Sequence, residues 1–305
     1  MSYVYGGVVL TGVGYCITQY LKSVFTNPEP ITKFTNVQTI DCAKFTDELR
    51  NCINSDVEFS EIVINTADSE QLHALKSYNP RTTTWIIFAH NNINNMYKQS
   101  KIIKQLTKLS SVLIFDYRGC GNSTGVYSEN GVYIDIQAIW NYLVIDNNIL
   151  PSNIVLYGES VGAAIVTYLT YKLAKENTHP YRLVLQNGFT SVKKYLSYKS
   201  ENLTYPPDLE LEIMENMVQL NDLIGVYACD DYNLEEKLKE LTHISKIPVL
   251  IAHSKPNVIV EYHNSENLYN VCENKINVTL FDLDTPHFTI FYDKSYLIAL
   301  KKFLS

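Results

Sequence analysis

The chain has 305 residues, 46% of them hydrophobic, which is enough for one large domain with a buried core. Its net charge of −7 and the lack of clustered basic residues argue against a nucleic-acid partner, because phosphate binding needs a positive patch. The six cysteines have no CxxC spacing, so they indicate neither a zinc site nor a disulfide framework and favour free thiols in a reducing, cytoplasmic compartment.

Residues 1–56 form a segment ahead of the predicted domain. From Ser2 to Leu21 no side chain is charged, and this stretch has about the length of a membrane span. It is only mildly apolar, however, and it lacks the basic start and dense apolar centre of a signal peptide. Two interpretations stay open: a segment that associates with a membrane surface, or a segment that packs on the domain.

Residues 57–305 alternate short apolar runs with longer helical patterns, which is typical of parallel strands joined by crossover helices. Runs at 57–65 and 71–78 predict a hairpin around the residues ADSE. Strands buried on both faces are predicted at 85–89, 112–116, 154–157, 183–185, 249–252 and 278–281. Helical periodicity is clearest at 97–109, 133–144, 161–175, 262–271 and 292–304. The predicted fold is therefore α/β, a mostly parallel twisted sheet with helices on both faces.

Residues from about 190 to 231 break this alternation and contain two consecutive prolines and several tyrosines. We expect a short cap inserted over the sheet. Tyr195, Tyr198 and Tyr205 are candidates for lining an acyl-chain groove, with ordinary packing as the alternative.

The strand-like run at 154–157 leads into Gly158-Glu159-Ser160-Val161-Gly162, a G-x-S-x-G pattern. In this motif the chain turns sharply from strand to helix and holds the serine in a strained backbone conformation above the sheet. Glycines are needed on both sides because side chains there would collide within the turn. A strand before the pattern and a helix after it supply the expected context. Ser160 is the predicted nucleophile.

A serine needs a base to take its proton and donors to hold the oxyanion. His287 follows the last strand-like run, where the base falls in the chain order serine, acid, histidine. The amides of Asn92 and Val161 are the predicted oxyanion donors, since they follow the first parallel strand and the nucleophile. His90 is expected to shape the first of these loops. Nothing in the sequence implies a cofactor or a metal ion.

Four blocks of sequence add a family resemblance. They are IIFAHNN at 86–92, FDYRGCGNSTG at 115–125, IVLYGESVG at 154–162 and the C-terminal stretch from 244 to 305. Together they resemble the α/β-hydrolase-domain branch of the α/β-hydrolase superfamily, which includes protein depalmitoylases and membrane-associated acyl hydrolases. The resemblance covers about residues 57–304. It implies an α/β-hydrolase fold and hydrolysis of acyl esters or thioesters, and it supports Ser160 and His287 by position.

Departures from the family pattern bear on the site. Asn91 stands where the family has glycine, and we expect the loop to survive because asparagine tolerates positive φ. Asn257 stands where the family has its catalytic aspartate; an amide can orient an imidazole but cannot stabilise its positive charge. Three outcomes stay open: a working Asn257, a site that does not hydrolyse, or a substitute acid. The candidates for that acid are Glu261, Asp282 and Asp284.

The predicted function is cleavage of an acyl ester or thioester, in a lipid or an S-acylated protein, through an acyl-enzyme on Ser160. One alternative is a catalytically impaired hydrolase fold that serves as a binding or scaffold module. Another is a serine peptidase, which would need a deep, charged substrate pocket. Asp116 and Arg118 are expected to lock the loop after their strand by ion pairing and hydrogen bonds, and Glu159 to be a polar neighbour of the site.

Overall fold

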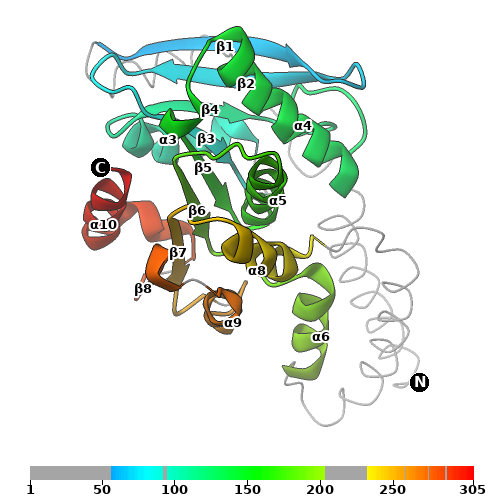
Figure 1. The fold of residues 1–305 in the computed structure, drawn as a ribbon, viewed down its shortest axis with the longest axis vertical. Coiled ribbons are helices and arrows are strands. Elements are labelled where there is room, and N and C mark those ends of the chain that lie inside the picture. Colours follow the sequence, from blue (N-terminus) through cyan, green and yellow to red (C-terminus); the bar gives the residue numbers. More distant parts are fainter. Residues whose placement is uncertain (1–55, 92–94, 203–231, 258, 274, 286) are drawn as a thin grey trace, which may run out of the picture.

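The structure is a computed structural model that describes residues 56–91, 95–202, 232–257, 259–273, 275–285 and 287–305. Within these residues lies an eight-stranded sheet of order β1-β2-β4-β3-β5-β6-β7-β8 (Figure 1). β2 pairs antiparallel with β1 and β4, and every other neighbouring pair is parallel. The strands are β1 Glu58–Asn65, β2 Gln71–Tyr78, β3 Trp85–Ala89, β4 Ser111–Phe115, β5 Ile154–Glu159, β6 Arg182–Gln186, β7 Val249–Ser254 and β8 Val278–Leu283.

The predicted hairpin and parallel strands are confirmed. Every residue of β3, β4, β5 and β7 is buried, which explains why their sequences are apolar almost throughout. Three strands continue beyond their apolar runs: β5 reaches Glu159, β6 reaches Gln186 and β7 reaches Ser254. Their polar ends stay in the ladder because each side chain finds a hydrogen-bond partner at the carboxyl edge of the sheet.

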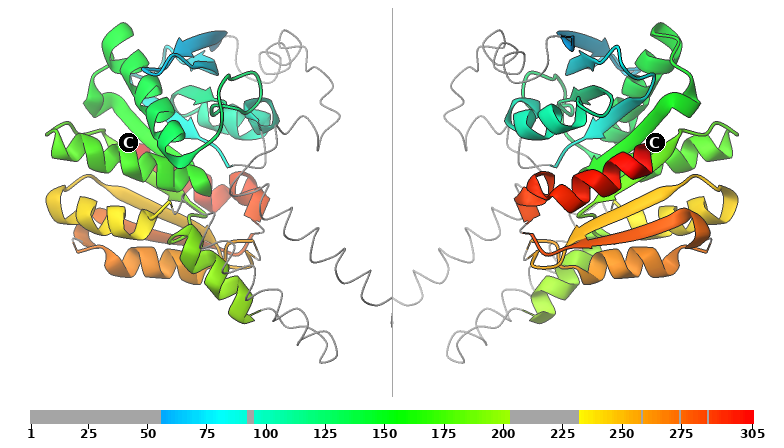
Figure 2. Two further views of the ribbon diagram at one scale, coloured as in Figure 1. Left: turned by 90° about the vertical axis from the view of Figure 1, so that its right-hand side faces the viewer. Right: turned by 90° about the vertical axis from the view of Figure 1, so that its left-hand side faces the viewer.

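Helices cover both faces of the sheet, as predicted (Figure 2). One face packs against α4 Glu129–Asn141, α5 Val161–Lys175, α8 Leu234–Ile244 and α9 His263–Val271; the other packs against α3 Ser100–Leu106 and α10 Lys294–Leu304. Alternate strand residues supply the two cores. In β5, for example, Leu156 belongs to the first core, and Val155 and Tyr157 belong to the second.

α8 is not among the clearest helical patterns of the sequence. It begins after Asn233, whose side chain accepts a hydrogen bond from the amide of Glu236. Charged residues fill most of its first two turns, so the buried stripe of leucines at 234, 238 and 241 is easily missed in the sequence. For a similar reason α4 begins before its predicted start: its polar first turn is capped by Ser128.

The N-terminal segment and most of the predicted cap lie outside the described residues. Of the range 190–231, the structure describes 190–202, which includes α6 Val192–Asn202. In the part of the chain that the structure describes, no helix is long and apolar enough to cross a membrane. The domain boundary at 56–57, the cap and the membrane association of residues 1–21 stay predictions.

Candidate active site

Ser160 occupies a strained turn between β5 and α5. Its backbone has φ 55° and ψ −118°, a conformation that non-glycine residues rarely adopt. A Cβ atom on Gly158 would lie 2.2 Å from the carbonyl oxygen of Gly162, and a Cβ on Gly162 would lie 2.0 Å from that of Ala89. Both glycines are therefore required by backbone contacts, as the sequence pattern predicts.

The elbow glycine gives a stability prediction. Gly162→Ala is expected to lower the free energy of unfolding by about 3 kcal/mol, because its new methyl group collides with the β3 backbone, which cannot move aside. Gly188→Ala is the matched control, since the three atoms nearest to its Cβ would be side-chain carbons rather than backbone: those of Ala163 at 3.1 Å, Leu234 at 3.4 Å and Leu268 at 3.6 Å. Thermal or urea unfolding of both variants checks this. Equal losses of stability would contradict the assignment of steric strain to the elbow.

The loop after β3 carries one of the two predicted oxyanion donors, Asn92, which lies outside the described residues. The other predicted donor, Val161, is buried at the N-terminus of α5. Asn91 does not have a positive φ, so the tolerance of asparagine for that conformation is not what the position uses. Instead its side chain is buried, and its Nδ2 donates to Oε2 of Glu159 at 3.0 Å. The asparagine is therefore explained by its buried, hydrogen-bonded side chain and not by the conformational freedom of its backbone.

The buried side chains of His90 and Asp116 make hydrogen bonds to the backbone of this loop and of the residue after it. His90 is 1% exposed, and its Nδ1 lies 2.6 Å from the carbonyl oxygen of Asn91; burial lowers its pKa to about 4, so the imidazole is neutral at pH 7. Asp116 accepts a hydrogen bond from the amide of Met96 at 2.7 Å, and burial raises its pKa to about 7. These contacts bear out the expectation that His90 shapes the loop. No group of three or more metal-ligating side chains occurs among the described residues.

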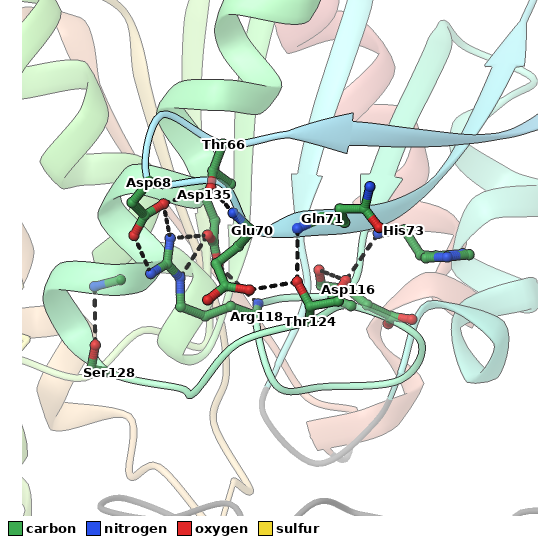
Figure 3. A network of polar contacts seen from close by, with 12 residues as sticks. Thr66, Asp68, Glu70, Gln71, His73, Asp116, Arg118, Thr124, Ser128 and Asp135 are labelled. Carbon is green, nitrogen blue, oxygen red and sulfur yellow. Dashed lines mark hydrogen bonds and ion pairs between the residues drawn. The ribbon is translucent and has the colours of Figure 1, made fainter.

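Arg118 locks the loop after β4, as predicted (Figure 3). Its Nε donates to Asp135 at 2.8 Å, and its two terminal nitrogens donate to Asp68 at 2.7 and 3.0 Å. Asp135 belongs to α4, and Asp68 belongs to the turn of the β1–β2 hairpin. The arginine lowers the pKa of Asp68 to about 2. A side chain whose donors are used in this way is structural.

Removal of this arginine should be costly. Arg118→Ala is expected to reduce the free energy of unfolding by about 3 kcal/mol, because it leaves the fully buried carboxylate of Asp135 without its cation. Arg81→Ala removes an ion pair with Asp56 in which both side chains are about half exposed, and should cost less than about 1 kcal/mol. Urea denaturation of the two variants makes the comparison. A small loss in Arg118→Ala would refute the locking role.

His287, the predicted base, begins a 3-10 turn at His287–Tyr292, a short loop after the end of β8. Its side chain lies outside the described set, so the pairing of its imidazole with Ser160 stays a prediction. Further along the same turn, Ile290 and Phe291 are buried in the second core with Tyr296 of α10. The segment that carries the predicted base is thus anchored at its C-terminal end.

No model of a known protein family matches the chain. An uncharacterised protein of Acanthamoeba polyphaga mimivirus is 27% identical over 221 residues, which cover 70% of this chain and 69% of that protein. Protein bem46 of Schizosaccharomyces pombe is 27% identical, with coverage of 71% and 66%. Lysophosphatidylserine lipase ABHD12 of Rattus norvegicus is 26% identical over 61% of this chain and 44% of the lipase. The chain thus matches less than two thirds of bem46 and less than half of the lipase.

Solved structures share the fold. An esterase of Pyrococcus furiosus superimposes with a TM-score of 0.62 at 20% identity, over 85% of this chain and 91% of the esterase. An alpha-beta hydrolase of Vibrio vulnificus gives 0.63 at 20% identity, over 85% and 86%. The chain therefore has the α/β-hydrolase fold. Its relatives confirm the resemblance to the α/β-hydrolase-domain branch.

Asn257, which stands at the aspartate position of the resembled family, has a local structural role. Asn257 is 4% exposed, and its Oδ1 accepts hydrogen bonds from the amides of Ile259 and Val260, each at 3.0 Å. Its Nδ2 lies 3.3 Å from Nε2 of His253, which also lies 2.8 Å from the carbonyl oxygen of Val260. The oxygen of Asn257 is thus engaged within its own loop.

The three candidate substitute acids lie in different environments. Asp282 forms an ion pair with Lys255 on the surface, and this pairing holds its pKa below the usual value. Asp284 is exposed. Glu261 is half-buried in the loop between β7 and α9, and its carboxylate partly offsets the lowering of the pKa of His253 that burial causes. Of the three, Glu261 combines partial burial with a place in the loop that follows β7.

The described residues include a buried polar cluster that the sequence did not reveal. It consists of Asn91, Glu159, Gln186, Tyr157 and Tyr296. The available signal was a glutamate and a glutamine that end adjacent apolar strands, but nothing in one sequence shows that these strands pair. The predicted cap tyrosines have ordinary contacts. Tyr195 donates to the carbonyl oxygen of Ile259 at 2.8 Å, the ring of Tyr198 lies 4.0 Å from that of His263, and Tyr205 is outside the described residues.

Proposed function

We propose that the protein is a serine hydrolase that cleaves acyl esters or thioesters through an acyl-enzyme on Ser160. The observation that carries the proposal is the strained elbow: Ser160 lies at the carboxyl edge of the sheet and at the N-terminus of α5, and both flanking glycines are fixed by backbone contacts. A structural turn would not need this conformation, whereas a nucleophile that must stand clear of the sheet does.

The reaction would proceed in two acyl transfers. Ser160 Oγ attacks the substrate carbonyl while His287 takes the hydroxyl proton, and the amides of Val161 and Asn92 hold the oxyanion. The bond to the leaving group then breaks as His287 returns the proton to it, which leaves an acyl ester on Ser160. Water attacks this ester with His287 again as base, which releases the acid and restores the serine.

Glu261 is our choice for the acid that orients His287. The oxygen of Asn257 already accepts two backbone hydrogen bonds, and Asp282 is paired with Lys255. Glu261 is half-buried on the same loop as Asn257, four residues further along the chain. A carboxylate from this loop would fix the imidazole tautomer and stabilise its positive charge, which an amide cannot do.

The substrate class follows from the relatives and from the surroundings of the elbow. A relative named as a lysophosphatidylserine lipase and a structural neighbour named as an esterase favour a lipid or small ester with an apolar acyl part. An S-acylated protein presents a chemically similar acyl group as a thioester. Such substrates fit a cytoplasmic protein that works at a membrane surface. No described feature favours a peptidase.

A serine-reactive fluorophosphonate tests the proposal, because it labels only a serine that a base has activated. We expect the wild-type protein to be labelled at Ser160. The second candidate function, a binding or scaffold module without hydrolysis, is motivated by the amide at Asn257 and predicts no labelling of the folded protein.

A further inference from the structure

Glu159 is a buried carboxylate at the centre of the candidate site. It is 2% exposed, ends β5 and directly precedes Ser160. The side chain and the backbone amide of Asn91 both donate to it, the former at 3.0 Å, and the side chain of Gln186 donates at 3.4 Å. None of these partners is a cation, and burial raises the pKa of Glu159 to about 7.

The cluster continues from Glu159 to the C-terminal helix. Gln186 Oε1 accepts from the hydroxyl of Tyr157 at 2.5 Å, and that hydroxyl also bonds to the hydroxyl of Tyr296 in α10. Tyr157, Gln186 and Tyr296 are each at most 1% exposed. The loop after β3, the elbow and α10 are therefore joined by one set of buried hydrogen bonds.

A carboxylate is an expensive choice for this position if folding is its only purpose. Burial without a cation penalises the charged form, and an apolar side chain would fill the space at lower cost. What a carboxylate adds is the ability to accept several hydrogen bonds, here two of them from Asn91. Asn91, which Glu159 holds, directly precedes Asn92 in the chain. On the other side, Glu159 is followed by Ser160 and then by Val161. Glu159 thus links the two strand ends from which the oxyanion donors follow.

We propose that Glu159 is a positioning residue that fixes the loop after β3 through Asn91 and thereby sets the two oxyanion donors relative to each other. This inference rests on the proposed function, and it explains the departure from the family pattern. A glycine at position 91 would offer only its backbone amide, whereas asparagine adds a side-chain donor that the carboxylate requires.

A reversed pair tests the inference. Asn91→Asp alone replaces the side-chain donor by a second carboxylate beside Glu159, and the two negative charges repel each other. The fluorophosphonate labelling rate should then fall about 100-fold, the usual effect of losing an oxyanion donor. Glu159→Gln alone keeps an acceptor and should lower the rate by less than about 10-fold. The double variant restores a hydrogen bond with donor and acceptor exchanged, so its rate should return to within about 5-fold of wild type.

Asn79→Asp is the matched control. Asn79 is also a buried asparagine, 6% exposed, with its Nδ2 bonded to the carbonyl oxygen of Thr107, but it lies beyond the opposite end of β3. This variant should lose stability as Asn91→Asp does and still label at nearly the wild-type rate. If the folded double variant labels no faster than Asn91→Asp, the inference is wrong.

Amide exchange separates this inference from the proposed function. Glu159→Ala removes the acceptor of the backbone N–H of Asn91, so hydrogen exchange of that backbone amide should become at least about 10-fold faster. Unchanged exchange would overturn the positioning role even if labelling works. If exchange becomes faster in Glu159→Ala but the wild-type protein is never labelled, the positioning role of Glu159 is supported. The hydrolase proposal is then contradicted instead.

Discussion

Replacement of Ser160 by alanine is expected to reduce hydrolysis of an acyl ester by about 10⁵-fold and to abolish fluorophosphonate labelling. The reason is that no other described group occupies the elbow, so the acyl-enzyme cannot form. Steady-state turnover of a short-chain p-nitrophenyl ester and gel detection of the labelled protein provide the measurements. The variant should fold normally, because Ser160 is only half-buried and alanine is smaller.

Ser77→Ala is the control for this experiment. Ser77 is a buried serine on β2, far along the sheet from the elbow, and its loss should leave both labelling and turnover close to wild type. Equal labelling of wild type and Ser160→Ala would place the reactive serine elsewhere. Absence of labelling in a folded wild-type protein would favour the scaffold function.

Glu261→Gln is expected to lower kcat by about 10² to 10⁴-fold, since an amide in place of the orienting carboxylate can hold the imidazole in the wrong tautomer. The change keeps the size of the side chain. KM should change little, because the acid acts in the transition state and does not bind the acyl chain. Ester hydrolysis between pH 6 and 9, with the unfolding temperature recorded in parallel, measures both effects.

Two neighbouring variants decide which residue is the acid. Asp282→Asn breaks a surface ion pair with Lys255 and should change kcat by less than about 3-fold. Asn257→Asp should also have little effect on kcat if Glu261 already serves as the acid. The new carboxylate would be tolerated, because the amides of Ile259 and Val260 donate hydrogen bonds to this position. A rise of about 100-fold in Asn257→Asp, with no loss in Glu261→Gln, would show instead that the natural chain lacks its acid.

The parallel strands and the elbow were predictable because local patterns determine them. An uninterrupted apolar run such as WIIFA at 85–89 suits a strand covered on both faces, and β3 has those bounds. Gly158 and Gly162 identify a turn in which side chains would strike backbone, and the clashes at 2.2 and 2.0 Å bear this out. These inferences needed no knowledge of distant contacts.

The surroundings of Asn91 and Asn257 were not predictable in the same way. Asn91 was expected to replace glycine through backbone tolerance, but it does so through a hydrogen bond to Glu159, 68 residues away. The identity of the acid depends on which of several loop carboxylates is already paired. Such answers depend on strand order and loop packing, which spacing within one sequence does not determine.

The hydrogen bonds of Arg118 to Asp68 and Asp135 limit how far the protein can be shortened from its N-terminus. One carboxylate that holds the guanidinium comes from the β1–β2 turn, and Gln71 and His73 of β2 bond to side chains of the loop at 123–124 (Figure 3). The antiparallel hairpin is therefore a working part of the loop beyond β4, although it stands at the margin of the sheet. A shorter chain that begins after this hairpin would retain Ser160 but lose the support of that loop.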